Sequence, residues 1–377
     1  MKEYLFRDVE PYALEVVDSK GVYLIDKSGD KYLDLLAGWC VGNSGWKNTE
    51  ILNQLKKFNG PTYVMMDFQY ARWEVLAKKL VKLMPNDKYV CFKATGGTES
   101  VEIAMKIARA HTKRKKFIAF KEAYHGQSLA ALSLVKISEH EKHFGKLFED
   151  YLQVNTNDWD KTTKEVVELI SNGDIAAFIS EPIILNLGVI IPPKSFFDEV
   201  TKACKKNGTL LIMDEVASGF GRTGKMFGFE HFDIVPDIVT IAKGTSGGYG
   251  GIGATIVKDE IAESMRFEFS NYSTYGWHPL SVEAAIANID YIQENNLIKK
   301  SEKSGEYFMK KLSEFSKPEG KGLCIGIPCK NKNITSDCFS DKVIIGCYFD
   351  RILICPSLEI SEKEIGGAIS IIKKHFK

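Results

Sequence analysis

Residues 237–253, DIVTIAKGTSGGYGGIG, place Lys243 directly after a short apolar run and directly before a glycine-rich turn. The run Ile238–Ile241 predicts a buried strand, because it is continuous, β-branched and bounded by a turn. An ammonium group at the end of a buried strand costs several kcal/mol to desolvate unless it is paired, neutral or covalently modified. Lys243 is therefore either a surface lysine just past the strand or a nucleophile for a carbonyl group.

The glycines after Lys243 contain the pattern GxGxxG at positions 248–253, which is also found in dinucleotide-binding proteins. That fingerprint requires a strand before the pattern and a helix that opens at it. Here a second apolar, strand-like run follows at 252–257 and no helical pattern opens. We therefore do not interpret the glycines as a dinucleotide site.

The composition is that of an ordinary globular chain of 377 residues, with 44% hydrophobic and 26% charged residues and a net charge of +1. Such a length suffices for one large and one small domain. The charge gives no electrostatic reason to expect nucleic acid or an anionic membrane as a partner, and no stretch reaches the roughly 18 apolar residues of a membrane span. The eight cysteines lack CxxC spacing, which predicts reduced, mostly buried thiols in a cytoplasmic protein.

Strand and helix patterns alternate through the middle of the chain. The predicted strands are residues 89–92, 116–120, 174–180, 209–213, 238–241 and 254–257. The predicted helices are residues 74–84, 101–108, 165–170, 195–205 and 279–293. Because the strands are continuous apolar runs, we expect an α/β protein with a large, mostly parallel sheet covered on both faces.

The chain is divided by these patterns into three parts. Residues 1–45 are an N-terminal segment with a hairpin signal at 21–35, expected to join the small domain and to supply an active-site loop. Residues 46–292 are expected to form the large domain that binds the cofactor. Residues 293–377, with two short strands and two helices, are expected to form a small α+β domain.

Polar residues recur just past the ends of the predicted strands. They are Thr98, Tyr124, His125, Glu181, Asp214 and Lys243. In open α/β sheets the carboxyl edge of the strands is where ligands bind. The turn before the helix at 101–108 also offers free backbone N–H groups and a helix dipole to an anion, with Thr98 as its N-cap or as a phosphate ligand.

This set of residues has one natural joint use. Lys243 supplies an amine for an imine with an aldehyde, Asp214 holds a protonated pyridine nitrogen, and Tyr124 stacks on the ring beside His125. The glycine turn holds a phosphate. Together they predict pyridoxal 5'-phosphate (PLP) chemistry, and no metal is expected.

Four motifs then resemble the class III, or ω-, aminotransferases, which are PLP-dependent enzymes of fold type I. They are MDEVASGFGRTG at 213–224, GGTESVE at 96–102, YHG at 124–126 and TYGWHPL at 274–280. The similar segments run in the family's order from about residue 21 to about residue 365. The resemblance implies an enzyme that moves an amino group between an amine or amino acid and a carbonyl acceptor. A PLP-dependent aminomutase, racemase or decarboxylase on the same fold is the alternative.

The resemblance also implies a role for each matching residue. Lys243 would form the cofactor aldimine and move the proton, Asp214 would pair with the pyridine nitrogen, and Val216 and Tyr124 would lie on the two faces of the ring. The remaining cofactor residues would be Gly97, Thr98, His125 and Glu181, joined by Thr274 from the neighbouring subunit of a homodimer. The loop at 39–46, which contains Trp39, would line the substrate side.

The chain departs from the family where substrate carboxylates are usually bound. Gln127 follows the YHG motif where the family often has an arginine, Asn186 replaces a glutamate, and Leu353 replaces the arginine that pairs with it. An arginine fork is the best bidentate holder of a carboxylate. We therefore expect that the enzyme does not use the usual glutamate/2-oxoglutarate pair.

The sequence leaves the substrate residues open. Trp39, Gln127, Asn186 and Arg72 are the candidates for the substrate side. Three arginines remain that could anchor a substrate carboxylate, namely Arg72, Arg222 and Arg351, but the sequence does not show where they lie in the fold.

Overall fold

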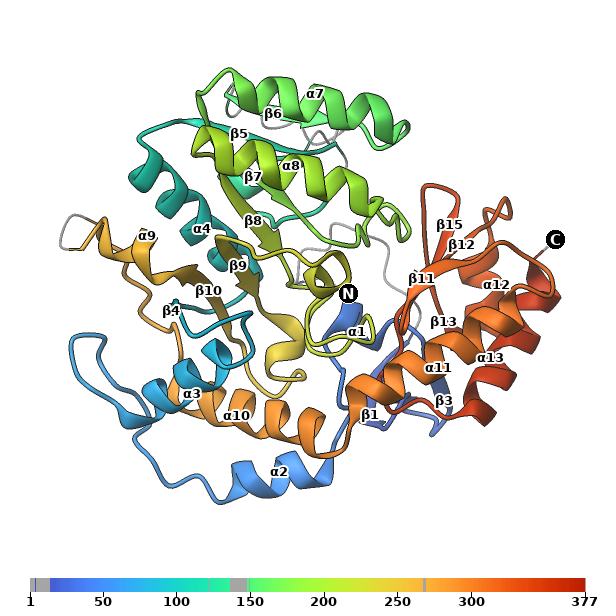
Figure 1. The fold of residues 1–377 in the computed structure, drawn as a ribbon. Helices are drawn as coiled ribbons and strands as arrows, with labels where there is room; N and C mark the ends of the chain where they lie inside the picture. The colour runs from blue at the N-terminus through green and yellow to red at the C-terminus, as the bar shows by residue number, and fades with distance from the viewer. Residues whose placement is uncertain are drawn as a thin grey trace.

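The computed structural model describes residues 4, 14–121, 123–135, 148, 150–266 and 269–376. Residues 1–3 and 5–13 of the predicted N-terminal segment lie outside this part of the chain. The central feature is a seven-stranded sheet with the strand order β4-β10-β9-β8-β7-β5-β6 (Figure 1). In that order the strands are Tyr89–Ala94, Gly253–Lys258, Ile238–Ile241, Leu210–Asp214, Ile175–Ser180, Lys116–Phe120 and Tyr151–Val154.

Six of the seven strands run in the same direction. The neighbours from β6 to β9 are paired in parallel, and β10 is antiparallel to both β9 and β4. Strand β4 therefore points the same way as β9, and only β10 is reversed. The predicted, mostly parallel sheet is confirmed. The interpretation that the glycines at 248–253 are not a dinucleotide fingerprint is confirmed as well, because strand β10 follows them and no helix opens there.

Helices cover the sheet because their apolar faces and the buried strands share one core. Every residue of β7, β8 and β9 is buried. Helix α4 (Gly97–Thr112) packs on β4, β9 and β10, and α8 (Lys194–Asn207) packs on β8 and on α7 (Trp159–Ser171). Helix α10 (Pro279–Glu294) packs against α2 (Thr49–Lys56) and α3 (Ala71–Val81). The short helices α5 (Leu129–Ser133), α9 (Asp259–Glu263), η1 (Gly228–Phe232) and η2 (Lys243–Thr245) connect these elements.

The N-terminal and C-terminal segments lie side by side (Figure 1). One small sheet contains β1 (Val16–Lys20), β2 (Tyr23–Asp26), β3 (Lys31–Asp34) and β13 (Val343–Ile344), with β13 parallel to β3. A second contains β11 (Glu319–Lys321), β12 (Cys324–Pro328), β15 (Arg351–Ile354) and β14 (Gly346–Tyr348). Helices α11 (Leu297–Leu312), α12 (Ile334–Ser340) and α13 (Glu362–His375) complete this region. The hairpin expected near the N-terminus is present as β2 and β3, whereas the three-part division of the chain stays a prediction.

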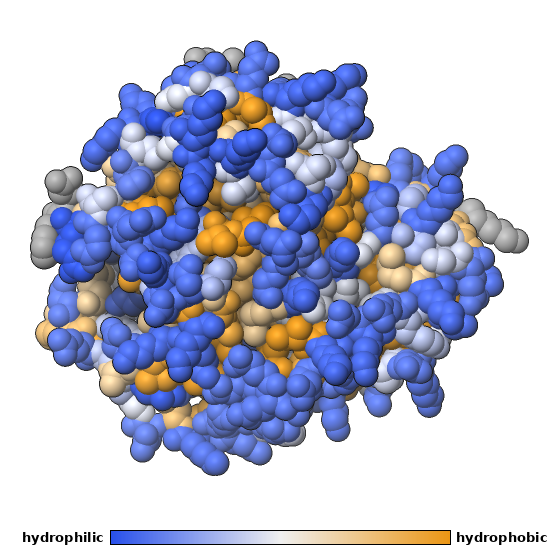
Figure 2. All heavy atoms as spheres, in the orientation of Figure 1, coloured by the Kyte–Doolittle hydropathy of each residue, from blue (hydrophilic) through white to orange (hydrophobic). Residues whose placement is uncertain are grey.

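The surface is mostly polar. On the face shown in Figure 2, hydrophilic side chains form most of the rim and apolar side chains gather towards the middle. Within the described ranges no helix combines the length and the hydropathy needed to cross a membrane. The same residues contain no cluster of histidine, cysteine and carboxylate side chains that would bind a metal ion.

Candidate active site

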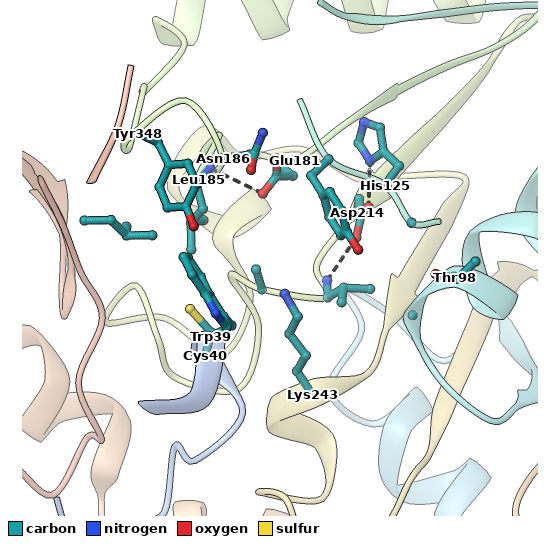
Figure 3. Close-up of a pocket in the computed structure, with 16 residues that line it drawn as sticks. Trp39, Cys40, Thr98, His125, Glu181, Leu185, Asn186, Asp214, Lys243 and Tyr348 are labelled. Carbon is teal, nitrogen blue, oxygen red and sulfur yellow. Dashed lines mark hydrogen bonds and ion pairs between the residues drawn. The ribbon is translucent and has the colours of Figure 1, made fainter. Parts of the chain in front are cut away.

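A cavity of about 440 Å³ lies where the carboxyl edge of the large sheet meets the two terminal segments (Figure 3). Its walls come from all parts of the chain. They are Trp39, Cys40, Gly97, Thr98, Tyr124, His125, Gly126, Glu181, Leu185, Asn186, Asp214, Val216, Ala217, Lys243, Tyr348 and Leu353.

The six polar residues predicted at the strand ends all line this cavity. Thr98 follows β4, Tyr124 and His125 follow β5, Glu181 follows β7, Asp214 ends β8, and Lys243 follows β9. These strands are parallel to one another, so their carboxyl ends meet at one edge. Figure 3 shows Lys243 pointing into the space between Asp214 and His125 on one side and Trp39, Cys40 and Tyr348 on the other.

Lys243 lies where the chain leaves β9. It opens the short helix η2 with φ of 42°, a left-handed conformation that is unfavourable for a residue with a side chain. Among the residues that the structure describes, no carboxylate forms an ion pair with its ammonium group. The backbone thus holds the Lys243 amine inside a largely apolar cavity, as a nucleophile for an aldehyde requires.

The buried Asp214 carboxylate is held by three donors. Its Oδ2 accepts a hydrogen bond from Nδ1 of His125 at 2.7 Å, and its Oδ1 accepts bonds from the Val216 amide at 3.1 Å and the Thr240 hydroxyl at 3.2 Å. Each carboxylate oxygen has more than one acceptor site, so Asp214 retains capacity for a further cationic partner in the cavity. The Nε2 atom of His125 is buried without a partner in the described structure.

Glu181 is buried beside Asp214 and carries less charge than a surface glutamate. Burial, and next the negative charge of Asp214, raise the pKa of Glu181 to about 8. One of its oxygens accepts a hydrogen bond from the Leu185 amide at 3.3 Å, and the other has no partner among the described residues. Glu181 is therefore mostly a neutral carboxylic acid at neutral pH, able to donate a hydrogen bond into the cavity.

The glycine turn before α4 leaves room for an anion. The helix begins at Gly97 after the extended N-cap Gly96, so Thr98 lies in the first turn, and the expectation that Thr98 is the N-cap was wrong. The Thr98 hydroxyl accepts a hydrogen bond from the Gln127 amide at 3.3 Å. A Cβ on Gly126 would lie 2.6 Å from that hydroxyl, and a Cβ on Gly97 would lie 2.9 Å from Val216. Only glycine permits this close approach, and the N–H groups of the first turn have no partners within the helix.

These features fit the cofactor that the motifs imply. The cradle at Gly97 and Thr98 suits a phosphate, the anchored carboxylate of Asp214 suits a protonated ring nitrogen, and the Lys243 amine suits an aldehyde. The cavity places all three groups around one space, with Val216 and Tyr124 also in its wall.

The wall of the cavity opposite Asp214 and His125 is built on a strained turn. Residues 37–40 form helix α1 (Ala37–Cys40), in which all four φ angles are positive, from 47° to 66°. Left-handed helical residues other than glycine cost roughly 1–2 kcal/mol each. Asp34 holds this turn, because its carboxylate accepts hydrogen bonds from the amides of Leu36 and Gly38 at 2.9 and 3.1 Å.

The left-handed turn places Trp39 against Tyr348 from the C-terminal segment. The two rings meet edge to face, with centroids 5.3 Å apart and an angle of 65° between their planes. Leu185, Leu353 and Asn186 lie in the same wall. The wall is thus largely aromatic and aliphatic. The sequence pattern predicted Trp39 and Asn186 on the substrate side but gave no signal for Tyr348.

The other predicted substrate residues do not line the cavity. Arg72 forms a bidentate ion pair with Glu283, with N–O distances of 2.5 and 2.6 Å. Arg351 binds the Gly188 carbonyl and Glu319. Gln127 contributes its amide to Thr98 but is absent from the cavity wall.

Arg222 is fully buried and also has partners of its own. Its guanidinium binds the carbonyls of Leu323 and Pro356 and the side-chain oxygen of Asn43. Among the described residues, none of the three arginines considered as carboxylate anchors therefore points into the cavity.

Thr274 lies apart from the main cavity. It lines a second, more open cavity of about 660 Å³, together with Gly97, Thr98 and Tyr275 of the same chain. Its expected contact with the phosphate of a neighbouring subunit stays a prediction.

Comparison with known proteins agrees with this geometry. The family model "Aminotransferase class-III" matches residues 4–376. The acetylornithine aminotransferase of Archaeoglobus fulgidus is 32% identical over 98% of this chain and 98% of its own. That of Methanopyrus kandleri is 35% identical over 86% of this chain and 83% of its own. Among solved structures, an aminotransferase of Bacillus anthracis is 30% identical, with a TM-score of 0.92 over 99% of this chain and 96% of its own.

The fold and the site define a PLP-dependent enzyme of fold type I. Within that class, the chain belongs to the class III aminotransferase family. It is an aminotransferase that uses pyridoxal 5'-phosphate.

Proposed function

We propose that this aminotransferase takes amines whose reacting carbon carries an apolar or aromatic group, and that it does not hold a substrate carboxylate with an arginine of its own. One observation carries the proposal. The substrate wall consists of Trp39, Tyr348, Leu185 and Leu353, with Asn186 as its polar member, and no arginine lies among the described residues of the cavity. Apolar walls with a few polar groups select ligands by shape and burial.

The cofactor, when bound, supplies an aldehyde that takes up the amine and a ring that withdraws electrons from the reacting carbon. Lys243 is proposed to hold the cofactor and to carry a proton on Nζ, because its amine points into the cavity. Asp214 is proposed to keep the ring nitrogen protonated, since its carboxylate is anchored by the hydrogen bond with His125. Thr98 and the first turn of α4 are proposed to bind the phosphate.

Three further residues are proposed to support this arrangement. Tyr124 and Val216 are proposed to hold the ring between them, as both line the cavity on the side of Asp214. Glu181 is proposed to act as a neutral donor, since its raised pKa of about 8 keeps it protonated at neutral pH. A second full negative charge there would compete with Asp214 for the positive ring.

We also propose a homodimer in which Thr274 serves the site of the neighbouring subunit. Large side chains are exposed around the second cavity: Tyr272 is 72% exposed and Tyr275 is 64% exposed. Tyr63 packs edge to face on Tyr275, at 6.1 Å, and extends this surface. Contiguous exposed aromatic groups of this kind mark association surfaces. A cytoplasmic location is proposed as well, because all eight cysteines are free thiols.

The experiment is a donor screen on the purified holoenzyme. We expect 1-phenylethylamine and other apolar amines to convert the cofactor to its amine form, with loss of the aldehyde absorbance, and L-glutamate to do so far more slowly. Acetylornithine is included because relatives carry its name. Rapid conversion of the cofactor to its amine form by L-glutamate would overturn the proposal on substrates. Borohydride should fix the cofactor on Lys243, and a label at another lysine would overturn the assignment of that residue.

A further inference from the structure

The cavity wall contains a thiol that amine transfer does not use. Cys40 lines the cavity between Trp39 and the floor that carries Lys243 (Figure 3). Two more buried cysteines, Cys355 and Cys324, interact electrostatically with it. The three come from separate segments: Cys40 ends the left-handed turn, Cys355 follows β15 and Cys324 begins β12.

The backbone holds Cys40 and Cys355 next to each other. The Cys40 amide donates to the Leu36 carbonyl at 2.9 Å, and the Cys355 amide donates to the neighbouring Leu35 carbonyl at 2.7 Å. The Cys355 thiol also reaches the Leu36 carbonyl, at 3.4 Å. Both cysteines are thus anchored to the short segment Leu35–Leu36, which holds the two side chains in the same region of the fold.

The two thiols have different roles in this pair. The interaction with Cys355, followed by the positive charges of Arg222 and Lys243, lowers the pKa of Cys40 to about 6, against the opposing effects of burial and Asp34. The same interaction, together with burial, raises the pKa of Cys355. Cys40 is therefore the more acidic thiol of the pair.

Arg222 explains why a buried anion is tolerated here. Its guanidinium binds only neutral groups in the described structure, namely two carbonyls and the side-chain oxygen of Asn43. A buried cation without a carboxylate partner favours an anion nearby, and Arg222 is one of the charges that lower the pKa of Cys40. In the described part of the chain, Cys91 and Cys338 have no such cation near them, and burial raises the pKa of each to about 12.

We propose that Cys40 is an oxidation site in the active-site cavity, with Cys355 as its resolving thiol. A hydroperoxide small enough to enter the cavity is attacked by the Cys40 sulfur; the O–O bond breaks, and the products are a sulfenic acid on Cys40 and hydroxide (or alkoxide). The Cys355 thiolate, after loss of its proton, then attacks the Cys40 sulfur. The S–S bond forms, the S–O bond breaks, and the hydroxyl group leaves with a proton as water. The peroxide is reduced by two electrons and the two thiols are oxidised by two.

The disulfide changes the substrate wall. A bond of about 2 Å between the sulfurs pulls the Cys40 side chain out of the cavity wall towards β15. The backbone of the turn is already strained at Cys40 and at the adjacent Trp39, so the movement is transmitted to the Trp39 ring. Formation of the disulfide also removes the ionisable Cys40 thiol that interacts electrostatically with Lys243. Amine transfer is then expected to stop until a dithiol reduces the bond.

The first test needs no activity and so does not depend on the proposed substrates. The holoenzyme is treated with hydrogen peroxide, free thiols are blocked with N-ethylmaleimide, and the peptides are mapped by mass spectrometry. We expect a Cys40–Cys355 disulfide. A disulfide between Cys324 and Cys355, or no disulfide, overturns the proposal. In the untreated enzyme, alkylation of Cys40 should rise with pH around 6 and at pH 7 exceed that of Cys91 by about a hundredfold or more. A rise only above pH 8 also overturns it.

The second test separates the two thiols by substitution. Peroxide should lower the transfer rate of the wild-type enzyme by about tenfold or more, and dithiothreitol should restore it. In Cys355→Ser the same loss should occur, but Cys40 proceeds to sulfinic acid and dithiothreitol no longer restores the rate. Cys91→Ser, which changes a thiol outside the cavity wall, should behave as the wild type. Full recovery of oxidised Cys355→Ser by dithiothreitol contradicts the resolving role.

Discussion

Replacing Gly126 with alanine tests whether the phosphate cradle depends on the close approach of two backbone segments. The new Cβ would lie 2.6 Å from the Thr98 hydroxyl and 3.0 Å from both its Cβ and its Cγ2. No rotamer of Thr98 avoids all three contacts, so the side chain or the turn has to move. Overpacking of this kind costs about 1–3 kcal/mol, and the φ of 134° at position 126 adds a strain of about 1–3 kcal/mol for a residue with a side chain.

A displaced Thr98 also weakens the cofactor site. Loss of one hydrogen bond to a charged phosphate corresponds to about 1.5–3 kcal/mol, which is about a tenfold to hundredfold weaker dissociation constant. Gly173→Ala is the matched control, because Gly173 has φ of 79° but nothing within 4 Å of the new Cβ. Urea unfolding and a PLP titration followed by absorbance measure both effects. The reasoning is refuted if the two variants bind PLP equally well.

Three further predictions concern single side chains. Arg72→Gln breaks the ion pair with Glu283 and should lower the free energy of unfolding by about 1 kcal/mol or less, without changing KM for an amine substrate. A raised KM would show that Arg72 contributes to substrate binding after all. The folded state holds the Glu181 proton up to a pH of about 8, whereas the unfolded state loses it near 4.5, so stability falls as pH rises through that range, by up to about 1.4 kcal/mol per pH unit. Glu181→Gln should lack this slope in urea unfolding. Mixing Lys243→Ala with Thr274→Ala subunits should create one intact site per mixed dimer; no regained activity would place Thr274 in the site of its own subunit.

The strand ends were predictable because two simple rules apply to them. Continuous β-branched runs such as Ile238–Ile241 predict buried strands, and parallel strands bring the residues that follow them to one edge. Asp214, Glu181 and Lys243 could therefore be grouped before the fold was known. The weak edge strand β6, with the sequence YLQV, escaped detection because a polar residue interrupts a run of only four.

The aromatic wall of the cavity was only partly predictable, since it depends on contacts between distant segments. Tyr348 lies on the three-residue strand β14, far from Trp39 in the sequence, and the two rings meet only in the folded chain. The left-handed turn that places Trp39 is held by Asp34 and contains one glycine among its four residues, so no local propensity indicates it. The pairing of Cys40 with Cys355 likewise spans most of the chain.

The charges in the cavity bear on the proposed choice of substrate. The anchored Asp214 carboxylate lies in its wall, and Lys243 is the one lysine or arginine among the described lining residues. Both groups are assigned to the cofactor in the proposed function, so neither is available to hold a substrate carboxylate. Glu181 adds no full negative charge, because its raised pKa of about 8 keeps it protonated at neutral pH. Under the proposed function an acid would therefore lose its hydration without gaining a bidentate partner, whereas an uncharged apolar group beside the reacting amine would bury its surface against Trp39 and Tyr348.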